Sequence, residues 1–343
     1  MKPRAAALLL AAVAACGGTP KTPAPKDAPL PIAHVVDLAP AAGLESLVVL
    51  EPHAILAHAE LLPVLDLLIP DQRFRAFAER NGGVDPRQLD ELVIASYAGG
   101  RTLVLTGGPF EPAKVEAAFV NRVTALDSRT IDKPGGPLST VVRLDGPGLH
   151  EHDELVLFGR QALGLELGPP NVGAGTHVGP LRAAELFAEG RLKKASPALR
   201  GAPLDATATD LGPAPARIFF PGPFGGGAEE GLAGLMKGAT AVGIAIEPAP
   251  ARPDGKPAIH ATLVLSGAWG QDAEKAGERL GAAVNTLANS ALGKLCGVNQ
   301  PFRGPDVRTT PTALFVEVVV DAGAVARGVR AATGAEVDEI MKF

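Results

Sequence analysis

The feature that most constrains the fold is a strand pattern that occurs twice, each time before an amphipathic helix. Leu103–Gly107 reads LVLTG and Leu263–Gly267 reads LVLSG. A short apolar run that ends at a turn residue is typical of a buried β-strand. Around both runs the segments follow the order strand, helix, strand, strand, helix, strand. We therefore interpret the folded part of the chain as two related modules.

This order predicts the α+β class, with two split-βαβ-like modules in which mostly antiparallel sheets carry helices on one face. The predicted strands of the first module are 45–51, 92–97, 102–106, 140–144, 154–158 and 162–167, and its helices are 52–69, 73–80 and 111–123. The second module is predicted to have strands 217–220, 241–247, 258–266 and 313–320, and helices 228–237, 271–295 and 324–332. A connecting helix is expected at 181–194.

The beginning of the chain has the composition of a leader and a tether. Lys2 and Arg4 precede an apolar run that is too short to span a bilayer, and the segment 17–31 is rich in proline. Such a proline-rich segment favours extended geometry, about 3.1 Å per residue, or about 45 Å in all. The expected organisation is a signal peptide at 1–15, a lipidated N-terminus and tether at 16–43, module 1 at 44–170, a connecting segment with a helix at 171–211, and module 2 at 212–343.

Val13-Ala14-Ala15-Cys16 resembles the lipobox of bacterial lipoprotein precursors. The resemblance covers only the N-terminus, and the family of the folded body is not recognised from sequence. It implies cleavage before Cys16, attachment of diacylglycerol to the Cys16 sulfur, and anchoring in the cell envelope through two or three acyl chains. Gly17 follows the cysteine where an aspartate would favour inner-membrane retention, so the expected location is the outer membrane.

Charge and cysteine content exclude several classes of function. The net charge is −5, or about −7 once Lys2 and Arg4 are removed with the leader, and the chain has no basic block. Nucleic-acid binding is therefore not expected. With Cys16 blocked by lipid, Cys296 has no partner for an intramolecular disulfide, and its apolar neighbours favour a small buried hydrophobe over a reactive thiol.

The histidines of the chain are weak candidates for metal ligands. His150 and His152 lie two residues apart among carboxylates, which suits a metal shell, but the segment has the pattern of a solvated hairpin tip. No further histidine has useful spacing, His177 being the nearest. His53 and His58 are five residues apart on a predicted helix and face different sides. We predict no metal and no cofactor, and leave metal binding at His150 and His152 open.

Two loops resemble catalytic motifs only in part. The glycine-rich loop 221–227 lies between a strand and a helix but lacks a Gly-Lys-Ser/Thr ending, and Glu229 and Glu230 follow where phosphate would bind. Ser266 follows a strand and precedes a glycine, but Val264 stands where a nucleophile elbow requires glycine. No catalytic residue is predicted, and we expect that the protein is not an enzyme.

The segment 54–69 is apolar on more than one face, which indicates burial on two sides or an apolar surface kept for a ligand or partner. The leading interpretation is a membrane-anchored envelope lipoprotein that binds or scaffolds an envelope protein partner. The alternative is a carrier or sensor of a hydrophobic small molecule, and an enzyme with a site built from distant residues is a third. A continuous apolar cavity under 54–69 would favour the carrier, whereas tight packing would favour the scaffold.

We expect the substitution Cys16→Ala to abolish incorporation of labelled fatty acid, because the thioether can form only on that sulfur. The variant should also leave the membrane fraction. Metabolic labelling and membrane fractionation measure the two effects, and unchanged labelling would contradict the lipobox.

Overall fold

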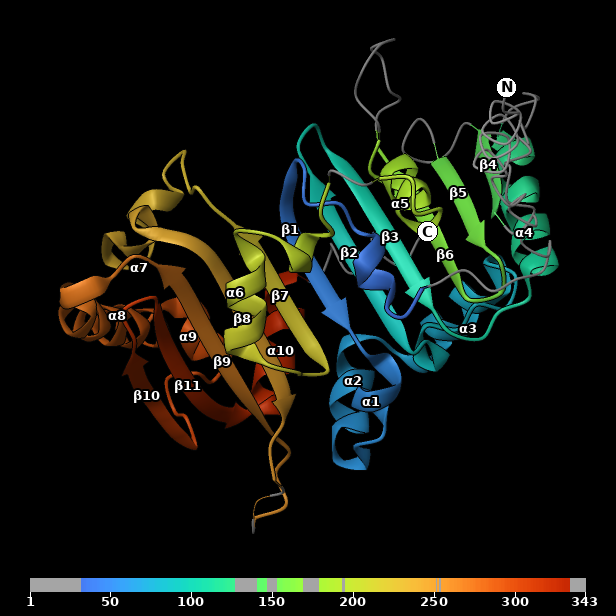
Figure 1. The fold of residues 1–343 in the computed structure, drawn as a ribbon. Coiled ribbons are helices and arrows are strands. Elements are labelled where there is room, and N and C mark those ends of the chain that lie inside the picture. Colours follow the sequence, from blue (N-terminus) through green and yellow to red (C-terminus); the bar gives the residue numbers. More distant parts are fainter. Residues whose placement is uncertain are drawn as a thin grey trace, which may run out of the picture.

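The computed structural model describes residues 32–126, 141–146, 153–168, 179–192, 195–250, 252 and 254–333. Within these ranges eleven strands form one antiparallel sheet that runs through both halves of the chain (Figure 1). In sheet order the strands are β10 (Arg303–Thr309), β11 (Ala313–Asp321), β9 (Ala258–Gly267), β8 (Ala239–Pro248), β7 (Ala216–Pro221), β1 (Leu44–Leu50), β2 (Glu91–Tyr97), β3 (Arg101–Gly107), β6 (Ala162–Leu167), β5 (Asp153–Phe158) and β4 (Val141–Gly146).

The two halves meet where β1 pairs with β7. Leu47 lies opposite Phe219 in this antiparallel pair, and both side chains are fully buried. Outward from this joint the order is β1-β2-β3-β6-β5 on one side and β7-β8-β9-β11-β10 on the other. The repeated segments thus occupy equivalent strands, β3 and β9, each third from the joint. The first half carries one further strand, β4, at its edge.

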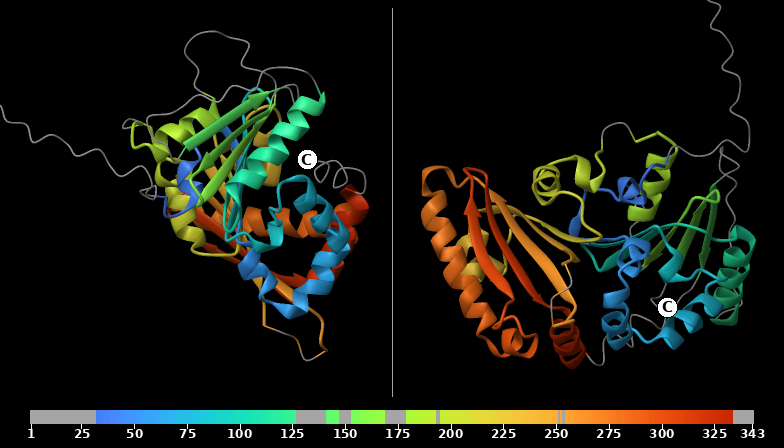
Figure 2. Two further views of the ribbon diagram at one scale, coloured as in Figure 1. Left: turned by 90° about the vertical axis from the view of Figure 1, so that its right-hand side faces the viewer. Right: turned by 90° about the horizontal axis from the view of Figure 1, so that it is seen from below.

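In each half the main helices lie on one face of the sheet (Figure 2). In the first half these are α1 (Pro52–Leu56), α2 (Leu62–Leu68), α3 (Asp71–Arg80) and α4 (Pro112–Leu126), with the 3-10 turns η2 (Ala59–Leu61) and η3 (Pro86–Gln88). In the second half they are α7 (Gly231–Gly234), α8 (Ala273–Ala288), α9 (Ala291–Leu295) and α10 (Ala322–Thr333), with η5 (Ala228–Glu230), η6 (Leu235–Lys237) and η7 (Gly270–Asp272).

The reverse face is covered by the segment that connects the halves. This segment forms α5 (Pro180–Ala188), η4 (Ala198–Arg200) and α6 (Leu204–Leu211), and η1 (Val35–Leu38) joins them on the same face. The main hydrophobic core lies there, between these elements and strands β1, β2, β3, β5 and β7. Close packing extends to the backbone, since a Cβ on Gly243 of β8 would lie 2.6 Å from side-chain atoms of Thr207 and Leu211 in α6.

Buried polar contacts fix these covering elements to the sheet. Glu166 of β6 accepts a hydrogen bond from the Leu181 backbone N–H of α5 at 2.9 Å and forms an ion pair with Arg101 of β3 at 2.5 Å. Glu91 of β2 accepts from the backbone N–H of Val35 in η1 at 2.7 Å. A carboxylate at the first turn of a helix satisfies donors that have no partner inside the helix. The pKa of Glu91 is raised, chiefly because burial disfavours its charged form.

The α+β class and the antiparallel sheet agree with the sequence prediction, but the strand order differs from a split-βαβ plan. The segment between β1 and β2 leaves and returns at the same end of the sheet, so β2 pairs directly and antiparallel with β1. The helix predicted at 52–69 is interrupted between α1 and α2, because Pro63 lacks an N–H and its ring would clash with the preceding turn.

Two further differences have clear local causes. The helix predicted at 228–237 is replaced by short turns in which Leu232 and Ala233 have positive φ values of 50° and 58°. The strand β10 was not predicted because its sequence, RGPDVRT, is polar and contains a proline. It lies at the edge of the sheet, where proline is tolerated.

A stability prediction follows from the hydroxyl pair that joins α6 to β9. Thr207 and Ser266 are both buried and their hydroxyls lie 2.7 Å apart. We expect Thr207→Val to lower the free energy of unfolding by about 1–3 kcal/mol, because the Ser266 hydroxyl would remain buried without its partner.

Denaturant unfolding measures this loss. As a control, Thr209→Val changes an exposed hydroxyl of the same helix, which donates only to the Asp205 carbonyl, and should cost less than about 0.5 kcal/mol. In the double variant Thr207→Val/Ser266→Ala the cost should be smaller than the sum of the single effects. Strict additivity would show that the pair is not coupled.

Candidate functional site: an apolar cavity in the first half

A cavity of about 1030 Å³ lies between the sheet of the first half and the helices that cover it. Its wall is mainly apolar and comes from every helix of that face and from strands β1, β2, β3, β5 and β6. The residues that line it include Leu50, Ile55, Leu56, Leu65, Leu68, Ile69, Phe74, Phe77, Leu92, Ile94, Val104, Val115, Ala118, Phe119, Leu155, Leu163, Leu165 and Leu167. The volume is at the upper end of that of small-molecule sites.

We call the side of the cavity formed by the sheet the floor. The alternation of side chains along the strands determines which residues line it. In β3, Leu103 and Leu105 point into the main core, so Thr102, Val104 and Thr106 point to the opposite face and line the cavity. Neighbouring β2 alternates in the same way and presents Leu92, Ile94 and Ser96. The floor is therefore fixed by the same strands whose other face is packed solidly.

We call the side of the cavity opposite the sheet the roof; it consists of the short helices α1, α2 and α3 with the turns η2 and η3. These elements contact one another more than they contact the sheet. Neither α1 nor α3 contains a buried residue, although α3 directs Phe74 and Phe77 into the cavity wall. The chain leaves the α-helical conformation at residues 57–61, before Pro63, and the two separate helices α1 and α2 both line the cavity. The apolar breadth of the segment 54–69 is thus explained: its residues Ile55, Leu65 and Leu68 face the cavity.

The equivalent position in the second half is filled. There α8 packs on β10 and β11, and its side chains share one hydrophobic core with side chains of β8, β9 and β11. Leu280 of α8 and Leu265 of β9 are fully buried, and Trp269 and Met236 pack against them. The second half thus has a packed core where the first half has the cavity, which is bordered by a smaller buried cluster that includes Leu89, Val115 and Leu155.

One polar group of the wall is a partly buried arginine. Arg122 of α4 lies 3.6 Å from the carboxylate of Asp153, and its guanidinium donates to the Asn81 side chain at 3.3 Å and stacks on the ring of Phe119. Burial lowers the pKa of Arg122, and the nearby Asp153 charge opposes this. The Nε of Arg122 and the Oγ1 of Thr106 are buried and form no hydrogen bond among the described residues.

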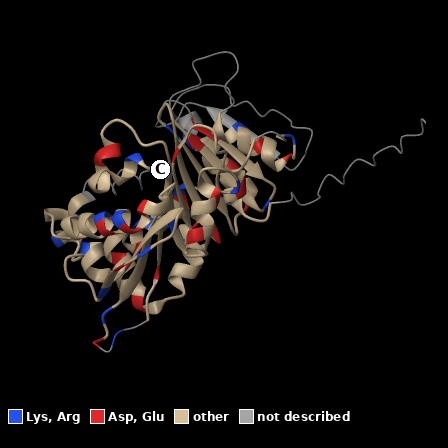
Figure 3. Cartoon of the chain, turned by 60° about the vertical axis from the view of Figure 1, so that its left-hand side comes forward, with Lys and Arg blue, Asp and Glu red and all other residues tan. Residues whose placement is uncertain are grey.

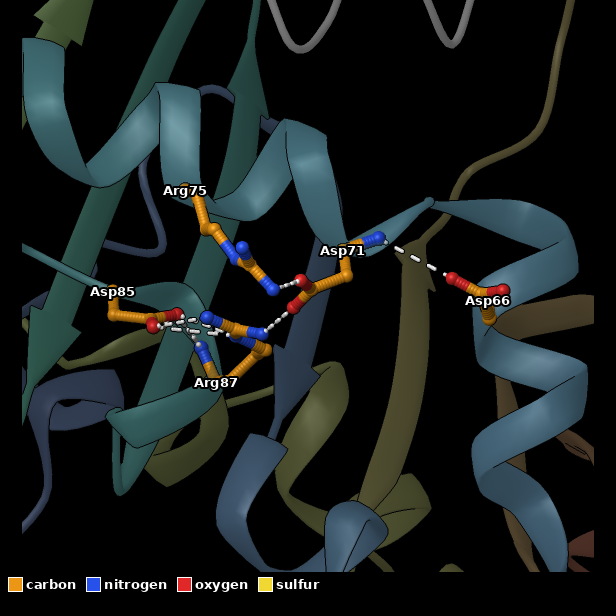
Figure 4. Close-up of polar contacts among 5 residues, drawn as sticks. All are labelled: Asp66, Asp71, Arg75, Asp85 and Arg87. Carbon is orange, nitrogen blue, oxygen red and sulfur yellow. Dashed lines mark hydrogen bonds and ion pairs between the residues drawn. The ribbon is translucent and has the colours of Figure 1, made fainter.

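A charged cluster ties the roof together, and Figure 4 shows its five side chains. Arg87 of η3 donates to Asp85 through Nη2 at 2.6 Å and also pairs with Asp71 at the start of α3. Arg75 pairs with the same Asp71, whose backbone N–H donates to Asp66 of α2 at 3.2 Å. We call Asp66, Asp71, Arg75, Asp85 and Arg87 the roof cluster. It joins α2, α3 and η3 above the cavity.

The structure gives ordinary roles to most candidates from the sequence. Ser266 is buried against Thr207 and is not presented as a nucleophile. His58 contacts Glu60 at 3.3 Å, and His53 is exposed on α1. Cys296 is a buried free thiol, as expected, and it packs against Gly328. Cys16, His150, His152 and His177 lie outside the described residues.

Two other features are absent from the part of the chain that the structure describes. No group of three or more His, Cys, Asp or Glu side chains in these ranges could hold a metal ion. None of the described helices is both long and apolar enough to cross a membrane. In the view of Figure 3, acidic and basic positions are interspersed over both halves.

Sequence reasoning singled out the roof segment but not the rest of the site. The strands of the floor were predicted from the sequence. The face of the sheet that borders the cavity was not, because it depends on the pairing of strands that are distant in sequence, such as β3 and β6. The roof cluster and Arg122 were not singled out from the sequence, because the contacts Asp71–Arg87 and Asn81–Arg122 join residues 16 and 41 positions apart.

Comparison with protein families, curated sequences and solved structures finds no match for this chain.

The roof cluster predicts a pH dependence. The hydrogen bond from Arg87 lowers the pKa of Asp85. A carboxylate whose pKa is lowered in the folded state contributes stability above its ordinary pKa, and this contribution is lost as the pH falls through the lowered value. We therefore expect Arg87→Gln to increase amide exchange in α3 at pH 7, and we expect the difference from the parent protein to vanish well below pH 4.

Hydrogen–deuterium exchange of the two proteins at matched pH makes the comparison, because intrinsic exchange rates then cancel. Arg75→Gln is the control, since Arg75 is 72% exposed and contacts only its own helix within the cluster; its effect should be smaller. A difference for Arg87→Gln that persists unchanged in acid would refute the proposed linkage.

Proposed function

We propose that the protein is an envelope-anchored binding protein that holds a hydrophobic small molecule in the cavity of its first half. The observation that carries the proposal is the cavity itself, about 1030 Å³ and walled mainly by leucine, isoleucine, valine and phenylalanine. The lipobox at Cys16 and the proline-rich tether support the location, which stays a prediction from sequence. This function is the alternative that a cavity under the segment 54–69 favours over a scaffold.

Energetics support an occupant. The cavity is partly open to solvent, so without an occupant its apolar wall is in contact with water. That exposure is unfavourable in proportion to the apolar area. An apolar ligand that fills the space removes this area from water and stabilises the folded protein.

The wall also indicates the form of the ligand. Most of the surface offers only apolar contact, which suits an acyl chain or a similar hydrocarbon. The polar side chains Arg122 and Asn81 lie together in the wall, so a polar end with acceptor oxygens would be oriented there. The carboxylate of Asp153 partly compensates the positive charge of Arg122. The Nε–H of Arg122 has no acceptor among the described residues, so a shift of the side chain would let it donate to a ligand oxygen. We therefore propose a single-chain amphiphile such as a long-chain fatty acid.

The proposal predicts that added bulk in the cavity removes binding. Val104 on the floor and Ala118 on α4 both line the cavity. We expect the double variant Val104→Trp/Ala118→Trp to weaken binding of palmitate at least roughly tenfold, because two indole rings take up space that the chain needs. The parent protein, purified gently from an envelope extract, should carry a reproducible added mass in native mass spectrometry.

Ala117→Trp is the matched control, because Ala117 is the neighbouring residue of α4 but is exposed and does not line the cavity. Circular dichroism checks that each variant keeps its secondary structure. A clean apo mass together with equal palmitate binding by all variants would contradict the proposal and return attention to a protein partner.

A further inference from the structure

The second half exposes a group of large apolar side chains on α8, α9 and α10. Leu287 is 55% exposed, Leu292 53% and Leu295 48%, and Val329 of α10 is 37% exposed. We call these four residues the leucine face. Single exposed apolar residues are normal, but three leucines within nine positions, each about half exposed, need an explanation.

Tight backbone packing holds these residues on neighbouring elements. Ser290 follows the C-cap residue of α8 and caps α9, and its hydroxyl oxygen accepts from the Gly293 N–H at 3.1 Å. A Cβ on Gly293 would lie only 2.3 Å from the Leu287 carbonyl oxygen, so α9 folds directly back on the end of α8. On the other side, a Cβ on Gly328 would lie 2.6 Å from Cys296, so α10 lies against the end of α9. The leucine face is therefore carried on a rigid support.

Positive residues outnumber acidic ones on the elements that carry the leucine face. Residues 280–302 contain no Asp or Glu, and Lys294 lies between Leu292 and Leu295. The whole of α10 also lacks acidic residues and carries Arg327 and Arg330. Glu274, Glu278 and Arg279 all lie in the first half of α8, away from Leu287, and Arg303 pairs with Asp306. In a chain whose net charge is −5, this surface combines exposed leucines with an excess of positive charge.

We infer that the leucine face docks on a lipid bilayer that contains anionic headgroups. Apolar side chains on a short helical surface enter the interface between headgroups and acyl chains, and flanking Lys and Arg are attracted to anionic lipid. A soluble protein partner would not require the absence of acidic residues over so long a stretch. The inference concerns a surface separate from the cavity and stands without the proposed ligand.

The docking surface is connected to the roof of the cavity. Arg330 of α10 donates to the Leu67 carbonyl of α2 at 3.0 Å, and Ala322 and Ala326 pack with Leu61 and Val64. Docking by α9 and α10 therefore brings the roof helix α2 close to the bilayer. A molecule that leaves the cavity past α2 would then reach lipid over a short path.

The experiment places an environment-sensitive fluorophore at Leu292→Cys in the full chain, reconstituted on vesicles, with Cys296→Ala as background. The control site is Asp210→Cys, which is exposed on α6 at the opposite face of the sheet. On vesicles with phosphatidylglycerol, emission at position 292 should shift to the blue and be quenched by lipid-borne quenchers, and emission at position 210 should not. On phosphatidylcholine alone the quenching at 292 should fall at least roughly threefold.

Variants at other positions test the mechanism without touching the reporter. Lys294→Glu should reduce the quenching on anionic vesicles, and Leu287→Gln/Leu295→Gln should reduce it on both kinds of vesicle, whereas Phe220→Gln, on β7, should not change it. Equal, water-like emission at 292 and 210 would overturn the inference. A blue shift at 292 that depends on protein concentration without lipid would also overturn it, in favour of association between copies of the chain.

Discussion

The pairing of β1 with β7 is the interaction on which the rest of the structure depends. It joins two halves of equal strand order into one sheet, with Leu47 opposite Phe219 at the centre. Because side chains alternate along a strand, this register determines which residues of both halves face α5 and α6 and which face the helices on the other side. A shift of one residue would exchange the solid core for the wall of the cavity.

The strand order is common to both halves and belongs to the architecture, whereas the cavity belongs to the first half and depends on its particular sequence. An antiparallel sheet needs cover on its apolar face, and α8 supplies it in the second half with Leu280 packed on Leu265. In the first half the helices that cover the same face leave the cavity between themselves and the sheet. The fold alone therefore does not produce the cavity. The cavity depends on the segment between β1 and β2, in which the helix is interrupted before Pro63 and the ion pairs of the roof cluster connect the short elements.

The sequence predicted those elements whose signals are local. The strands with apolar runs and the helices with clear periodicity were located within a few residues, and β3 and β9 were recognised as equivalent. The helix predicted at 52–69 is interrupted before Pro63, and α6 was missed because LDATATDL carries few large apolar residues. The sequence left a cavity and tight packing under the segment 54–69 as two alternatives, because the choice depends on the distance between the roof and the floor. That distance is set by contacts such as Arg87–Asp71, between residues 16 positions apart.

The roof is the part of the fold with the least hydrophobic support, and this bears on how a ligand would enter. Helices α1 and α3 bury no residue completely, and each is shorter than the length at which isolated helices become stable in water. Their order comes from the apolar side chains that face the cavity and from the roof cluster. Local opening therefore costs less here than in the strands. A filled cavity adds apolar contacts to the same helices, so ligand binding and closure of the roof stabilise each other.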